Sequence, residues 1–182
     1  MAIKTFTTGE VLTASDTNTY LANAGLTYIT QATIGSGVSI VNIANCFSST
    51  YDNYRVTIRA NSATGSTSIL MQYGTGSPTV TNYKSFLTTP FVAWTSGVVT
   101  TVSTTDGSFI TYGHPTNITG VSDVFGPNLA VNTTSFGSYA TDTNGGTTAG
   151  IQTSNTQFTS LHIATAATIT GGTITVYGYR KA

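Results

Sequence analysis

Charged residues are scarce in this chain. Only 7% of its 182 residues are charged, six basic and six acidic, so the formal net charge is zero. Soluble domains average about 25% charged residues. Nucleic-acid binding depends on clustered Lys and Arg that neutralise phosphates, and the sequence has no such cluster. We therefore exclude nucleic acid as a partner.

Cysteine and long apolar runs are nearly absent as well. Cys46 is the single cysteine, which excludes an intramolecular disulfide framework. Its apolar neighbours in IANCFSS predict a buried, unreactive thiol. No apolar run approaches the roughly 18 residues of a membrane-spanning helix, so no membrane span is predicted. The opening MAIKTF does not resemble a signal peptide, and we expect synthesis in a cytoplasm.

Groups that could carry catalysis are equally few. The sequence has two histidines, His114 and His162, and six carboxylates. None of them has the spacing of a metal site or of a nucleophile–histidine–acid set. No pair of carboxylates of the kind that glycosidases use is indicated. We predict a protein without catalytic residues, metal ligands or cofactors, in which His162 is a core or interface histidine.

Thr is abundant, occupying 40 positions. Thr is β-branched and favours strands, and its hydroxyl keeps a surface polar without charge. Apolar and polar residues alternate with period two, most clearly where Tyr54, Val56 and Ile58 face one side of NYRVTIRA. Thr105-Asp106-Gly107 predicts a hairpin. Strand-like patterns cover residues 28–34, 38–43, 53–60, 67–73, 97–103, 108–113, 128–134, 137–143, 157–164 and 172–180.

About eight to eleven short strands with frequent turns are typical of an all-β sandwich. No strand–helix alternation indicates a parallel sheet. Heptad, collagen-like or other fixed-period repeats are absent, so the sequence contains no fibrous shaft. The fold class predicted is all-β, an antiparallel jelly-roll-type sandwich over residues 27–182.

The first 26 residues have a different sequence pattern, which predicts a helix. Thr13 is a good helix N-cap, Asp16 lies in the first turn, and Gly25 is a normal residue to end the helix. The predicted helix, ASDTNTYLANA, has an apolar stripe too thin to stabilise it alone. It must pack on its own domain or on another protein, and we predict that residues 1–26 form a docking arm.

Aromatic residues exceed what one small core needs, with ten Tyr, eight Phe and one Trp. Tyr and Trp supply contact area at low entropic cost. Core filling is the alternative for each of them individually. Trp94, bounded by Pro90 and Gly97, is the first candidate for a ligand-binding or interface residue, and the others are Tyr112 and Tyr139.

The segment FTTGEVLTASDTNTYLAN resembles the N-terminal segment of small tailed-bacteriophage virion proteins, commonly tail-fibre or minor structural proteins. The pattern is matched by Phe6, Gly9, Glu10, Val11, Leu12, Thr13, Ala14 and Asn18. The stretches FSSTYDNYRV and GTITVYGYRKA also resemble the strands that open and close the β domains of these proteins. Residues 60–170 carry no resemblance.

The resemblance implies a non-enzymatic structural protein on the outer surface of a virion, made in the host cytoplasm. Its arm would dock on other virion proteins, and its β domain would form a homotrimer. The implied docking residues are Phe6, Gly9, Glu10, Val11, Leu12, Thr13, Asn18, Tyr20 and Leu21.

Two functions fit this expectation. In the first, the protein is a tail fibre or tail-tip adhesin, docked on the tail or baseplate, whose distal loops bind a host-surface glycan. In the second, it is a capsid decoration protein, a cement or head-fibre protein that stabilises the shell. The resemblance of the arm favours the tail, and the missing shaft favours decoration. A glycan-degrading enzyme is a third, less favoured class.

Overall fold

The computed structural model describes residues 7–11, 13–16, 25–89 and 100–181. One short helix, α1, covers Ala14–Asp16, and all other regular structure in these ranges is β-strand. The eleven strands are β1 (Leu26–Thr33), β2 (Val38–Ile43), β3 (Asn53–Ala63), β4 (Ser68–Gly74), β5 (Tyr83–Thr89), β6 (Thr100–Thr104), β7 (Ser108–Tyr112), β8 (Ile118–Phe125), β9 (Thr133–Ala140), β10 (Gly145–Gln152) and β11 (Ser160–Tyr179).

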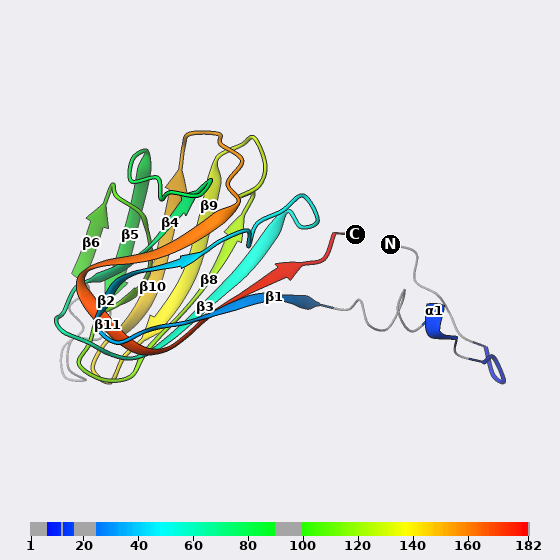
Figure 1. Cartoon of the computed structure of the whole chain (residues 1–182), viewed down its shortest axis with the longest axis horizontal. Helices are drawn as coiled ribbons and strands as arrows, with labels where there is room; N and C mark the ends of the chain where they lie inside the picture. Colours follow the sequence, from blue (N-terminus) through cyan, green and yellow to red (C-terminus); the bar gives the residue numbers. More distant parts are fainter. Residues whose placement is uncertain (1–6, 12, 17–24, 90–99, 182) are drawn as a thin grey trace.

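The strands form two layers that share the long strand β11. The larger layer has the order β6-β5-β10-β9-β8-β3-β11-β1, and the smaller has the order β2-β11-β4-β7. Every pairing is antiparallel. Because β7 packs against β5, β8, β9 and β10, the smaller layer covers one face of the larger sheet (Figure 1). We call the opposite face of the larger sheet the outer face.

A glycine pair lets β11 pass from one layer to the other. Residues 160–165 of β11 pair with β4, whereas residues 169–178 pair with β3. Near the start of the half that pairs with β3, Gly171 and Gly172 have φ values of 64° and 103°, a region that favours glycine. A Cβ atom on Gly172 would lie 2.0 Å from the carbonyl oxygen of Arg59. The bend of the sandwich therefore depends on this glycine.

The apolar core lies between the layers around β3, β4 and β11. On β3, Tyr54, Val56 and Ile58 are buried, as the period-two pattern predicted, and the residues between them point to the outer face. Tyr54 also joins the preceding loop to the strand, since its hydroxyl accepts a hydrogen bond from Ser48 N at 2.7 Å and donates one to Ser48 O at 2.8 Å.

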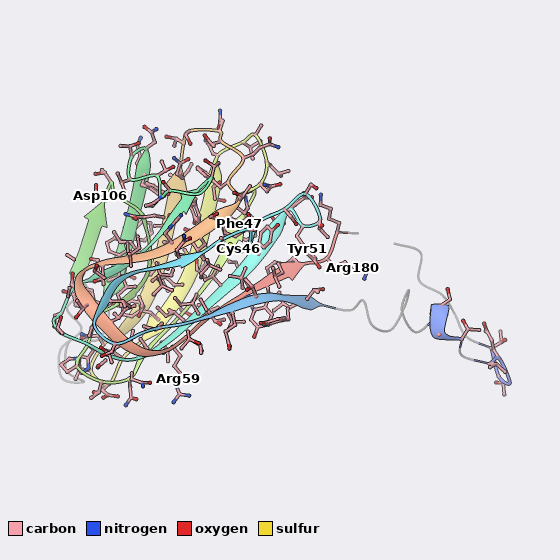
Figure 2. All side chains as sticks on the ribbon, viewed as in Figure 1. Cys46, Phe47, Tyr51, Arg59, Asp106 and Arg180 are labelled. Carbon is pink, nitrogen blue, oxygen red and sulfur yellow. The ribbon has the colours of Figure 1, made fainter. Side chains whose placement is uncertain are left out.

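The same loop places Cys46 and Phe47 between the layers, while Arg59 points away from them (Figure 2). The ring of Phe47 packs edge-on against Tyr54, with centroids 4.8 Å apart. Burial raises the pKa of the Cys46 thiol to about 12. The prediction of a buried thiol is confirmed.

Under β5, β9 and β10 the interior is lined by small hydroxyl residues. Ser108, Ser135 and Thr148 are buried, and their hydroxyls have no hydrogen-bond partner among the described protein groups. Gly150 lies so close to β7 that a Cβ atom there would be 2.5 Å from the Ser108 hydroxyl. Small residues on β10 therefore let β7 approach the larger sheet.

The predicted fold class, an all-β antiparallel sandwich, is confirmed. The predicted hairpin at residues 105–107 is wrong, because β6 pairs with β5 and β7 pairs with β4. The loop at 105–107 instead crosses between the layers. The division of the chain into an arm (1–26) and a sandwich (27–182) stays a prediction; the first strand begins at Leu26.

Candidate interaction surface

The arm holds a local turn at the centre of its predicted docking motif. Glu10 N donates to Thr7 O at 3.0 Å, and the Glu10 carboxylate accepts a hydrogen bond from Thr7 N at 3.1 Å. Gly9, with φ 88°, supplies the positive φ that the third position of a type II turn needs. The Gly-Glu step is thus a compact turn closed by its own side chain.

The described docking residues, Gly9, Glu10, Val11 and Thr13, are all exposed. Val11 is the most accessible of the exposed large apolar side chains, at 80%. Figure 1 shows α1 apart from the sandwich. The remaining predicted docking residues, Phe6, Leu12, Asn18, Tyr20 and Leu21, and most of the predicted helix lie outside the described residues.

The three aromatic candidates have separate outcomes. Trp94 lies outside the described residues. Tyr112 is half-buried and donates a hydrogen bond to Ser66 O at 3.2 Å. The interpretation of Tyr139 as a ligand-binding or interface residue is wrong. Tyr139 is 5% exposed and packs with Leu87 and Phe109 in a small core cluster, so a ligand cannot reach it.

The outer face instead carries a row of aromatic side chains that the sequence did not reveal. In an antiparallel sheet, residues paired across strands project from the same face. The register therefore places one line of side chains across seven strands: Tyr28, Tyr177, Arg55, Asp123, Phe136, Ala149 and Phe86. We call this line the outer row.

Aromatic rings stand at both ends of the outer row. Tyr28 is 60% exposed and meets Tyr177 edge to face, with ring centroids 6.2 Å apart. At the other end, Phe136 is 61% exposed, and Phe86 is also exposed. Phe125 and Leu26, in the next line of side chains, extend this apolar surface.

A neutralised ion pair forms the middle of the outer row. Arg55 donates two hydrogen bonds to Asp123, Nε to Oδ1 at 2.7 Å and Nη2 to Oδ2 at 2.8 Å. The Tyr179 hydroxyl donates to the same Oδ1 at 2.6 Å, and its ring lies 5.6 Å from the Arg55 guanidinium. Hydrogen bonds from Arg55, and then from Tyr179, lower the pKa of Asp123. The pair is charged but internally satisfied.

Two shallow hollows adjoin the outer row. One of about 270 Å³ lies between Arg55, Asp123, Phe136 and Thr147. The other, of about 360 Å³, lies over Thr57, Thr119, Val121, Ser138 and Ala140. Their walls mix apolar side chains with hydroxyls, and neither contains an unpaired charged group. This surface can receive protruding neutral groups.

A Thr–His contact outside this surface does not form a catalytic relay. Thr143 Oγ1 lies 3.1 Å from His114 Nε2, but the other ring nitrogen contacts the carbonyl oxygen of Thr116. The nearby carboxylate of Asp142 accepts hydrogen bonds from Thr116 and Asn117 instead. No three His, Cys, Asp or Glu of the described ranges are grouped so as to hold a metal ion. His162 was predicted to lie either in the core or at an interface, and the structure places it in the buried interior.

Comparison with known proteins gives no relative: no family model, no curated protein and no solved structure matches the chain. Within the described residues, no helix has the length and apolar character needed to cross a bilayer. The arm turn and the outer face are thus the two candidate interaction surfaces.

Proposed function

We propose that this chain is a non-enzymatic structural protein of a tailed-bacteriophage virion, docked through its N-terminal arm and displaying its β domain as a homotrimer. The observation that carries the proposal is the arm itself. Its described residues form their own turn, are exposed, and match the motif of virion proteins. Because the described arm side chains are exposed and do not pack in the sandwich core, another protein can contact them.

A tail fibre or tail-tip adhesin on the outer virion surface is the function that the motif favours. In this function the arm binds the tail or baseplate, and the sandwich is presented to a host-surface glycan. A rigid trimer would present three arms together, so that weak docking of each arm gives firm attachment of the whole.

Capsid decoration is the second candidate, and one observation favours it. In this sequence α1 ends at Asp16 and the sandwich begins at Leu26, so the arm and the β domain are not separated by a shaft. A cement or head-fibre protein lies close against the shell and needs no shaft. The number of copies per particle separates the two, since a shell carries hundreds of decoration subunits and a tail a few tens of fibre subunits.

Removal of residues 1–24 tests the docking role. The truncated protein is expected to keep the unfolding temperature of the full chain, because the described arm residues are exposed. Virions assembled with it should lack the protein on gels and in particle images. Unfolding of the truncated protein would show that the arm belongs to the core, and would overturn the proposal.

A point variant removes the ambiguity of a large deletion. Val11→Asp places a charge on the exposed arm, and Val131→Asp places the same charge on an exposed loop between β8 and β9. Both variants should fold normally. We expect incorporation into virions to fall at least tenfold for Val11→Asp and to stay unchanged for Val131→Asp. Equal incorporation of the two would contradict docking through this part of the arm.

A further inference from the structure

We propose that copies of this chain associate through the outer face of the larger sheet, with Phe136 in the contact. This inference rests on the homotrimer in the proposed function and names the surface that forms it.

The exposed aromatic side chains are concentrated on this face. The large hydrophobic residues with exposed side chains in the described ranges include four aromatics, and all four, Tyr28, Phe86, Phe125 and Phe136, lie on the outer face. Exposed apolar residues elsewhere are aliphatic and scattered over the arm, β2 and two loops. Contiguous aromatic surface of this kind marks interaction sites, and protein interfaces are enriched in aromatics and Arg.

The charges of the face suit burial against an uncharged partner. Arg55 and Asp123 neutralise each other, and Tyr179 supplies a further hydrogen bond to the carboxylate. The other two charged residues stand away from the outer row, Arg59 four positions along β3 and Lys84 two positions along β5. Interface centres are depleted of charge but enriched in Arg, so a centre whose charged groups are this internally satisfied pair can be buried by a partner.

The length of the outer row favours a second copy as the occupant. Seven strands at a spacing of about 4.8 Å give the row a length of roughly 30 Å. A single sugar unit or side chain covers only a small part of it. Another copy presents a row of the same width whose Arg55–Asp123 pair is likewise neutralised, so rings at both ends of the row can be covered together.

The shape of the face allows one copy to insert a ring into a hollow of another. Phe136 protrudes from β9, and the 360 Å³ hollow lies over β3, β8 and the part of β9 from Ser138 to Ala140, so knob and hollow are neighbouring parts of one surface. The Phe136 ring of one copy can enter the hollow of a neighbour, which excludes a dyad that passes through Phe136 itself. The number of three copies is taken from the homotrimer of the proposed function, in which such heterologous contacts close into a ring.

Molar mass in solution tests the proposal on the full chain. Phe136→Lys adds a charge on the outer face, and Ile40→Lys is the matched control, a 46% exposed strand residue of the smaller layer. Light scattering after size exclusion should give a three-chain mass for the wild type and for Ile40→Lys. Phe136→Lys should fall to one third of that mass while its circular dichroism stays that of the folded protein. A wild-type mass for Phe136→Lys would overturn the proposal.

Cross-linking gives a second, independent readout. Cys46 is buried, so a cysteine introduced by Phe136→Cys would be the accessible thiol of the folded chain. A bismaleimide should link Phe136→Cys into two-chain products on a denaturing gel, the largest product that one accessible thiol per chain allows, and should leave Ile40→Cys as single chains. The reverse result would overturn the proposal.

The outcomes separate this inference from the proposed function. A monomeric wild type that still enters virions through its arm would overturn the outer-face contact and the homotrimer, and would leave the docking role of the arm standing. Association that appears only after removal of residues 1–24 would show that the arm covers the face, and would also overturn it. If both proposals hold, Val11→Asp lowers incorporation into virions, and the molar mass of the variant in solution stays that of the wild type.

Discussion

Arg55 and Asp123 stand opposite each other on β3 and β8, joined by two parallel hydrogen bonds of 2.7 and 2.8 Å. Register alone brings them together, since 67 residues separate them in the chain. Arg–carboxylate pairs with this two-point geometry are the strong form of a surface ion pair. Their side chains are 37% and 27% exposed, so water screens the interaction in part.

The first prediction concerns Asp123→Asn. The variant keeps the shape of the side chain but loses the charge, and we expect the free energy of unfolding at pH 7 to fall by about 1–2 kcal/mol. Because the folded-state pKa of Asp123 is lowered, its contribution is complete above the unfolded pKa, about 3.9. The contribution is lost as the pH falls through the lower folded pKa. Urea unfolding of both proteins from pH 7 to pH 2.5 measures the difference.

Asp52→Asn is the control for that measurement. Asp52 pairs with Lys181 at 2.7 Å, but both side chains are more than two-fifths exposed. Such exposed pairs contribute about 0–1 kcal/mol, so this variant should destabilise less than Asp123→Asn. A difference between wild type and Asp123→Asn that stays constant down to pH 2.5 would contradict the assignment of its cause.

The second prediction concerns the hydroxyl of Tyr54. Tyr54→Phe removes two buried hydrogen bonds to the Ser48 backbone without opening a cavity. We expect a loss of about 1–3 kcal/mol in the free energy of unfolding, because a backbone donor and an acceptor are left without this partner. Tyr112→Phe, which removes a single exposed hydrogen bond to Ser66, should cost less. Equal urea midpoints for the two variants would count against this role.

Strands with clear alternation could be predicted from the sequence, and strands rich in glycine could not. The pattern of β3 gave both its position and its buried face. β5 was missed because its buried Ser85 and its exposed Phe86 break the apolar alternation. β8 and β10 were missed because Gly120, Gly146 and Gly150 lower strand propensity. The structure explains these glycines: a Cβ atom on Gly120 would lie 2.5 Å from the carbonyl oxygen of Ile110 in the covering layer. Close packing between layers outweighs local propensity here.

The outer row was beyond sequence reasoning for a related reason. Phe136 fell between two predicted segments, 128–134 and 137–143, whose adjoining ends belong to one strand in the structure, β9. Tyr139 was named as a ligand-binding or interface candidate, with core filling as the alternative. Since Phe136 points outward and the two residues are three positions apart, Tyr139 must point inward. The row itself forms only when seven strands pair in this register, and the register cannot be predicted from a single sequence.

The third prediction concerns the bend in β11. Gly172→Ala combines a positive φ of 103° with a Cβ atom 2.0 Å from the Arg59 carbonyl oxygen. We expect the variant to lose at least about 2 kcal/mol of stability, measured by thermal or urea unfolding. Gly65→Ala is the matched control, because a Cβ atom on Gly65 meets nothing within 4 Å. A Gly172→Ala protein as stable as the Gly65→Ala protein would show that the bend does not need glycine.

The fourth prediction compares two buried tyrosines that touch. The Tyr83 hydroxyl accepts a hydrogen bond from Tyr73 N at 2.7 Å, whereas the Tyr73 hydroxyl has no hydrogen-bond partner among the described protein groups. Burial raises the pKa of Tyr73 to about 12 although two serine hydroxyls lie nearby. Tyr83→Phe should therefore lower the free energy of unfolding by about 1–3 kcal/mol, because it leaves a buried N–H unpaired. Tyr73→Phe removes an unpaired polar group and should be neutral or stabilising in the same urea titration. If Tyr73→Phe is as costly as Tyr83→Phe, its hydroxyl is hydrogen-bonded in solution, and the hydroxyl-lined interior under β9 and β10 is a connected polar network.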